Sequence, residues 1–97
     1  MKLESAFKAK AKERIRECLG NDIFIHEMMC QTQGIPDTLI LCGYKWALLE
    51  FKRSRNATHR PNQDYYVDMF NSMGFASFVY PENFEDVLDD LRRYFYE

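Results

Sequence analysis

Residues 38–52 of the chain read Thr-Leu-Ile-Leu-Cys-Gly-Tyr-Lys-Trp-Ala-Leu-Leu-Glu-Phe-Lys. This stretch contains two apolar runs of strand length, residues 38–42 and residues 46–52, and the dipeptide Gly43-Tyr44 between them suits a tight turn. The pattern predicts a β-hairpin. Because a strand places alternate side chains on opposite faces, the register of this hairpin decides which polar residues meet at its open end.

The predicted hairpin brings two acidic residues together. Asp37 opens the first strand and Glu50 lies near the end of the second, at similar distances from the turn, so the two residues pair across the strands. Neighbouring carboxylates repel each other unless a cation lies between them. Hard oxygen ligands of this kind suit Mg²⁺ or Mn²⁺. The hairpin therefore predicts a site for a divalent ion.

A lysine completes this predicted site. Lys52 lies two residues after Glu50, so both side chains leave the same face of the strand. An ammonium group beside a phosphate stabilises developing negative charge or helps to deprotonate a water molecule. Either motif alone is more often structural than functional. Their combination, followed by a basic loop, favours hydrolysis of a phosphodiester.

The rest of the chain predicts helices and strands around the hairpin. A four-residue apolar repeat runs through Leu3, Phe7, Ala11 and Ile15, which predicts a first helix that ends at Gly20. Residues 23–29 form an apolar run that predicts a strand, and residues 31–36 predict a turn.

The second half of the chain predicts two more helices and one more strand. Pro61 suits the first turn of a helix whose buried stripe we expect to contain Tyr65, Met69 and Met73. Residues 75–80 predict a strand. The last helix carries an apolar stripe of Phe84, Val87, Leu88, Leu91 and Phe95. The expected order is α-β-β-β-α-β-α, an α/β fold with a mixed sheet flanked by helices.

Length and composition set the remaining limits. We expect residues 1–97 to form a single domain, because 97 residues leave little room for a second one. No run is long enough to span a bilayer, and the first residues lack the apolar stretch of an export signal, so we expect an intracellular, cytoplasmic protein. The cysteines are odd in number and widely spaced, which predicts buried free thiols.

Charge is unevenly distributed along the chain. Residues 1–60 carry 11 Lys and Arg against 7 Asp and Glu, whereas residues 61–97 carry 2 against 8. This asymmetry predicts one basic and one acidic surface, the alternative being two ordinary solvated faces. The loop at residues 52–60 is basic and follows the predicted site. It predicts contacts with a DNA backbone through Arg53, Arg55, His59 and Arg60, the alternative being a solvated loop.

The combined motifs resemble those of a known family. Gly34-Ile35-Pro36-Asp37 followed by Glu50-Phe51-Lys52 is similar to the signature of the PD-(D/E)xK nuclease superfamily. With Pro61-Asn62-Gln63 downstream, the set resembles the VRR-NUC domains of small stand-alone phage and prophage proteins. The resemblance covers nearly the whole chain and implies a restriction-endonuclease-like fold. The chain departs from the family pattern in one respect, since it shows no clear Val-Arg-Arg tract.

The resemblance also implies a role for individual residues. Asp37 and Glu50 would be metal ligands, with the backbone carbonyl of Phe51 as a third. Lys52 would be the catalytic lysine. Glu4 on the first helix resembles an acidic residue that contacts the metal or its water, and Gln63 resembles a glutamine beside the active site.

The function that this resemblance implies is that of a Mg²⁺- or Mn²⁺-dependent endodeoxyribonuclease. We expect it to be specific for DNA structure, to resemble a Holliday-junction resolvase, and to act on branched DNA as a homodimer. If a phage encodes it, it would act in the host cytoplasm. Two alternatives remain at this point: a nicking or flap nuclease with the same site, or a non-catalytic protein that binds nucleic acid through a nuclease-like fold.

Overall fold

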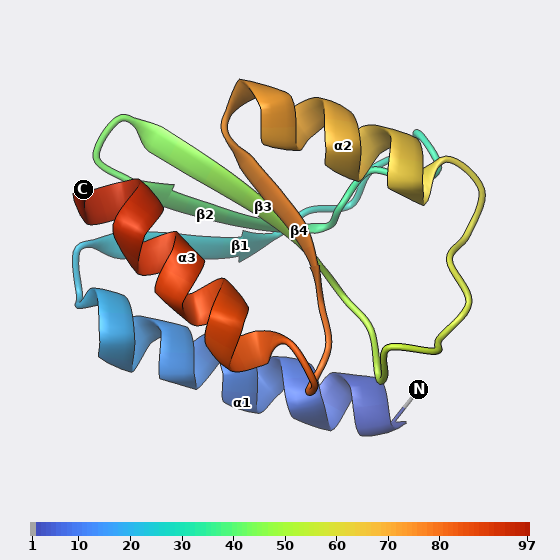
Figure 1. The fold of residues 1–97 in the computed structure, drawn as a ribbon, viewed down its shortest axis with the longest axis horizontal. Coiled ribbons are helices and arrows are strands. Elements are labelled where there is room, and N and C mark those ends of the chain that lie inside the picture. The colour runs from blue at the N-terminus through green and yellow to red at the C-terminus, as the bar shows by residue number, and fades with distance from the viewer. Residues whose placement is uncertain (1) are drawn as a thin grey trace.

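The computed structural model describes residues 2–97, with side chains from Glu4 onward. The chain forms three helices and four strands in the predicted order (Figure 1). Their bounds are α1 Lys2–Leu19, β1 Ile23–Glu27, β2 Thr38–Cys42, β3 Lys45–Phe51, α2 Gln63–Met73, β4 Phe75–Val79 and α3 Phe84–Tyr96. The α/β class and the mixed sheet predicted from the sequence are confirmed.

The strands lie side by side in the order β1-β2-β3-β4. Strands β1, β2 and β3 are antiparallel neighbours, and β4 runs parallel to β3 after the crossover through α2. Cys42 pairs with Lys45 across the two-residue turn, and Thr38 pairs with Leu49 at the other end of the hairpin. The predicted hairpin and its register are confirmed.

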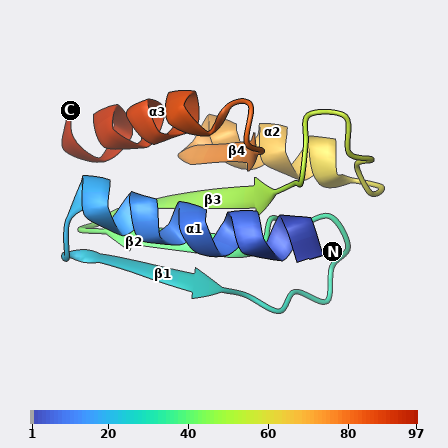
Figure 2. The same cartoon turned by 90° about the horizontal axis from the view of Figure 1, so that it is seen from below.

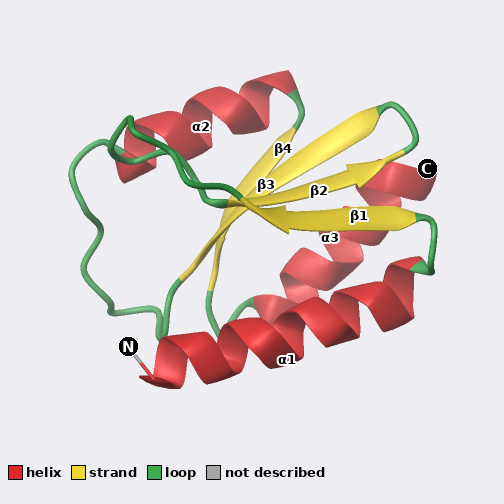
Figure 3. Ribbon diagram, turned by 180° about the vertical axis from the view of Figure 1, so that it is seen from behind, coloured by secondary structure: helices red, strands yellow, loops and turns green. Residues whose placement is uncertain are grey.

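The helices cover both faces of the sheet. Helices α1 and α3 lie together on one face, and α2 lies on the other (Figures 1, 2 and 3). The larger core lies between the sheet and the α1–α3 pair, where Ile15, Leu49 and Leu91 are fully buried. A smaller core beneath α2 contains Leu48 and Val67. This layered arrangement is the one expected when each helix has a single apolar face.

Helix α1 follows its predicted apolar stripe. Ala11 and Ile15 are buried, and Phe7 packs against the edge of the same core. The side chain of Leu3, which the stripe also includes, lies outside the described residues. Gly20, at φ +93°, ends the helix and donates its N–H to the carbonyl of Arg16 at 2.9 Å.

Helix α2 differs from its prediction. It begins at Gln63 rather than Pro61, because Asn62 adopts a left-handed conformation at φ 71° and separates the proline from the helix. Tyr65 and Met73, predicted in the buried stripe, are 62% and 65% exposed. Gln63 and Val67 are the buried residues of the helix. The predicted stripe was therefore wrong for Tyr65 and Met73, whereas Met69 is half-buried.

Two smaller expectations also need correction. Strand β1 ends at Glu27, so Met28 and Met29 belong to the loop that follows rather than to the strand. The three cysteines are free as predicted, but they are not buried: Cys30 is exposed, and Cys18 and Cys42 are half-buried. None of the helices among the described residues is long and apolar enough to cross a membrane.

Candidate active site

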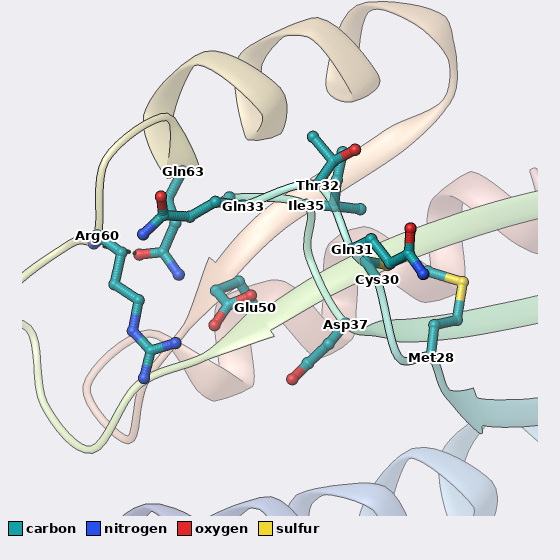
Figure 4. A pocket seen from close by; sticks show the side chains of 11 residues that line it. Met28, Cys30, Gln31, Thr32, Gln33, Ile35, Asp37, Glu50, Arg60 and Gln63 are labelled. Atoms are coloured by element: carbon teal, nitrogen blue, oxygen red, sulfur yellow. Dashed lines mark hydrogen bonds between the residues drawn. The ribbon is translucent and has the colours of Figure 1, made fainter.

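The predicted site residues gather where β3 ends and β2 begins. A pocket of about 360 Å³ opens there, lined by the loop between β1 and β2 together with Asp37, Glu50, Arg60 and Gln63. Figure 4 shows the side chains of Asp37, Glu50, Arg60 and Gln63 around this space, with Glu50 between Asp37 and Arg60. Three segments that are distant in sequence therefore meet at one end of the sheet.

The two carboxylates lie as the hairpin register predicts. Thr38 pairs with Leu49, so the next positions outward are Asp37 and Glu50. Burial and then the negative charge of Asp37 raise the pKa of the Glu50 carboxyl from 4.5 to about 7. The positive charges of Lys52 and Lys8 oppose this increase in pKa, and Glu4 adds to it.

Asp37 is the more accessible of the two carboxylates. Its side chain is 42% exposed, and its Oδ1 accepts a hydrogen bond from the Thr38 hydroxyl at 3.2 Å. Its Oδ2 lies 3.7 Å from the ammonium of Lys8. The Asp37 carbonyl accepts the N–H of Met28 at 2.7 Å, which ties the residue to the end of β1.

Lys52, two residues after Glu50, is held in a buried position. The lysine is 6% exposed. Its Nζ donates to the Oε1 of Gln63 at 2.8 Å and to the Thr58 carbonyl at 3.2 Å. The same Gln63 oxygen accepts the backbone N–H of Arg60 at 2.7 Å (Figure 4). Gln63 thus fixes the ammonium of Lys52 and the end of the 53–60 loop with one oxygen atom.

Gly34 joins the Asp37 turn to the start of α2. Its φ of +98° is a conformation that residues with a side chain rarely adopt. A Cβ at this position would lie 2.8 Å from the backbone carbon of Asn62. Gly34 is therefore required both for the turn and for the close approach of the residue that precedes Gln63.

The basic residues of the loop at residues 53–60 fall into two groups by position. Arg60 lines the main pocket, and it also lines a neighbouring hollow of about 220 Å³ together with Glu4, Lys52 and Arg53. Glu4, the acidic residue expected from α1, is thereby placed beside the lysine. The phosphate contacts predicted for Arg53 and Arg60 stay predictions.

Arg55 and His59 lie away from both hollows. The guanidinium of Arg55 lies over the ring of Tyr80 at 5.8 Å. The ring of His59 stacks on Phe78 at 4.0 Å, and its Nδ1 lies 2.8 Å from a carboxylate oxygen of Asp64. The DNA contacts predicted for these two residues stay predictions, and His59 has a role in packing the loop that the sequence did not reveal.

Lys8 is a residue of the site that sequence reasoning missed. It lies one helical turn after Glu4, and this i, i+4 spacing could have indicated that both side chains leave the same face of α1. Its proximity to Asp37 depends on how α1 packs against β1, which the sequence does not specify.

The donor set of the pocket fits a magnesium-type ion. Within residues 2–97, His, Cys, Asp and Glu side chains form no cluster of three that could hold a metal. Mg²⁺, however, is commonly held by one or two carboxylates together with substrate phosphates and water. Asp37 and Glu50 supply two such carboxylates. The carbonyl of Phe51, predicted as a third ligand, lies in the chain directly between Glu50 and Lys52.

The fold is an α/β domain, and its site residues resemble the PD-(D/E)xK signature. A solved structure described as a "VRR_NUC domain" matches 97% of this chain and 98% of its own, with a TM-score of 0.68 and 26% sequence identity. Over nearly its whole length the chain is therefore similar in fold and in sequence to a VRR-NUC domain. No family model matches the sequence, and no curated protein matches it. The structural match supports a nuclease-type function.

Proposed function

We propose that this chain is a Mg²⁺- or Mn²⁺-dependent endodeoxyribonuclease that hydrolyses phosphodiester bonds. The observation that carries the proposal is the position of Glu50, which follows the hairpin register opposite Asp37 and precedes the buried Lys52 by two residues. Burial and the charge of Asp37 raise the pKa of Glu50, so the carboxylate pair is stabilised by binding a cation.

Each of the proposed site residues has a distinct part in the reaction. Asp37 and Glu50 would hold the divalent ion, with the Phe51 carbonyl as a further ligand. When bound, the ion supplies a Lewis acid for the phosphoryl group and a means of activating water. Lys52 directs its ammonium at developing negative charge, and Gln63 keeps that ammonium in place.

Residues around the pocket would bind the substrate. Arg60 and Arg53, which share a hollow with Lys52, would contact phosphates on either side of the scissile bond. Glu4, in the same hollow, would contact the metal or its water.

Cleavage of a labelled DNA in Mg²⁺ tests this proposal. We expect activity in the wild type, none after addition of a chelator, and a loss of at least about a hundredfold in Asp37→Asn and Lys52→Ala. Lys10→Ala, which removes an exposed lysine of α1, serves as the matched control and should retain activity. Cleavage that survives Asp37→Asn would contradict the proposed site.

The proposed substrate is branched DNA, and the proposed active form is a homodimer. One chain supplies one Asp37–Glu50 pair, whereas a four-way junction is two-fold symmetric and needs two nicks. An apolar surface is available for such a dimer. Phe24 pairs with Leu41 across β1 and β2, and these side chains are 56% and 40% exposed. A second copy would remove both from water.

Substrate comparison and light scattering test the finer proposal together. Symmetric nicks in a four-way junction, made by a particle of twice the chain mass, would support a junction resolvase. Preferential cutting of a flap or a nicked duplex by a monomer would instead identify the alternative nuclease. Binding of DNA without cutting in Mg²⁺ or Mn²⁺ would identify a non-catalytic protein.

A further inference from the structure

A second lysine lies beside Asp37. Lys8 projects from α1, and its side chain is only 16% exposed. Its Nζ lies 3.7 Å from Oδ2 of Asp37 and 3.3 Å from Oε1 of Glu27. The same Nζ lies 5.9 Å from the centre of the Phe51 ring. The ammonium is therefore confined between two acidic residues and an aromatic face.

Glu27 connects Lys8 to a further cation. The carboxylate of Glu27 also accepts a hydrogen bond from Lys12, one turn further along α1. The backbone holds the acidic residues in place, because Glu27 pairs with Thr38 and the next N–H, that of Met28, donates to the Asp37 carbonyl. Charges therefore alternate along a row: Lys12, Glu27, Lys8, Asp37.

The position of Lys8 has an electrostatic consequence for the pocket. Asp37 and Glu50 together carry two negative charges when ionised, and Lys8 is the cation in ion-pair contact with Asp37. A cation so placed stabilises the carboxylates, but it also repels a divalent ion that approaches the same oxygens. Glu27 moderates this effect because it shares the Lys8 ammonium.

We propose that Lys8 is the resident counter-ion of the Asp37–Glu50 pair. Its positive charge balances the charge of Asp37 when no divalent ion is bound, and it weakens the binding of that ion. Glu27 sets how much of the Lys8 charge acts on Asp37. Lys8 is a positioning residue in this inference, which rests on the proposed role of Asp37 as a metal ligand. The consequence is that tight metal binding depends on a substrate phosphate to complete the ligand set.

Substitutions on either side of Lys8 should change metal affinity in opposite directions. Lys8→Met removes the competing cation, whereas Glu27→Gln leaves the ammonium to Asp37 alone. Two unit charges about 4 Å apart that are open to water interact strongly enough to change a binding constant by about threefold to tenfold. We expect Lys8→Met to bind Mn²⁺ more tightly by this factor, and Glu27→Gln to bind it more weakly.

The test is isothermal titration of DNA-free protein with Mn²⁺ at pH 8. Lys8→Arg, which keeps the charge, should stay close to the wild type. Lys10→Met removes an equal charge from an exposed position of α1 and should change affinity little. In the Lys8→Met background, Glu27→Gln should have a smaller effect than in the wild type. Unchanged or weaker Mn²⁺ binding by Lys8→Met, or an equal change in Lys10→Met, would overturn the inference.

A metal-free measurement separates this inference from the proposed function. In thermal unfolding without metal, Lys8→Met should lower the melting temperature less in an Asp37→Asn background than in the wild type, because the ion pair is then already lost. If the wild type binds no Mn²⁺ either alone or with DNA present, the proposed metal dependence is wrong, and this unfolding cycle still decides whether Lys8 balances Asp37. If the two substitutions change the melting temperature additively, Lys8 does not balance Asp37.

Discussion

The two sides of the pocket are built on different physical principles. On the Lys52 side, the ammonium has two oxygen acceptors within the protein, and Gln63 accepts two hydrogen bonds. On the Asp37 side, the carboxylates lie side by side and the pKa of Glu50 is raised to about 7. The first side is complete as folded, whereas the second is stabilised by an added cation. A catalytic lysine needs fixed geometry, and a metal site needs unbalanced negative charge.

The largest expected effect comes from Lys52→Met. We expect a loss of activity of about 10²–10⁴-fold, because no group remains to stabilise developing charge. Stability should stay the same or increase, because the substitution removes a buried charge whose acceptors in the structure are neutral oxygens. Cleavage rates and chemical denaturation measure the two effects. A large loss of stability would show that Lys52 is needed for folding rather than for chemistry.

Gln63→Leu should damage the Lys52 side through its hydrogen bonds. It removes the acceptor for the Lys52 ammonium and for the Arg60 N–H, and an unsatisfied buried group costs about 1–3 kcal/mol, more where it is charged. Both unfolding free energy and activity should therefore fall. Gln33→Leu, at an exposed position of the same pocket, is the matched control and should leave stability unchanged.

Gly34→Ala tests the contact that joins the two sides. The substitution forces a side chain into the left-handed region and against the Asn62 backbone, which should cost about 2 kcal/mol. Gly43→Ala has only the cost of the left-handed backbone conformation, because its φ is +64° but nothing lies within 4 Å of the added carbon. Equal losses of unfolding free energy in the two variants would show that the approach of Asn62 is unimportant.

Glu50→Gln should have the smallest effect, and it should raise the stability of the protein rather than lower it. A carboxyl whose pKa is raised by folding favours the folded state when protonated, so its ionisation destabilises the protein increasingly between pH 4.5 and about 7. At pH 8 without metal, Glu50→Gln should therefore stabilise the protein by about 1 kcal/mol, a figure reduced for partial exposure.

The pH dependence supplies the control for this last prediction. At pH 4 the Glu50 carboxyl is protonated in both the folded and the unfolded state, so the advantage of Glu50→Gln should disappear there. Glu17→Gln, at an exposed position of α1, should change stability little at either pH. A variant that is less stable than the wild type at pH 8 would contradict the electrostatic account of the carboxylate pair.

Several features of the molecule could be predicted from local sequence. The hairpin register followed from two apolar runs and a two-residue turn, and it alone placed Asp37 opposite Glu50. The stripe of α3 was predicted correctly in four residues, Val87, Leu88, Leu91 and Phe95, which are buried, and the fifth, Phe84, is half-buried against the same core. These features depend on periodicities of 2.0 and 3.6 residues, which are properties of the backbone.

The second helix shows where local sequence fails. Its apolar residues are distributed around the helix, so Tyr65 and Met73 were as suitable for burial as Val67. The buried face of the helix instead includes Gln63, a polar residue whose side chain has hydrogen-bond partners in Lys52 and Arg60. Burial of a polar group is favourable only when those partners are present, and they come from another part of the chain.

The sequence by itself therefore determined the element order, the Asp37–Glu50 pairing across the hairpin and the family resemblance, because each depends on residues that are close in the chain or on a motif. Tertiary structure decided which cations surround that pair. It placed Lys52 against Gln63, Arg60 beside Glu50, Lys8 between Glu27 and Asp37, and His59 on Phe78. The physical reason is that these contacts join separate elements, and their distances are set by helix packing against the sheet rather than by spacing along the chain.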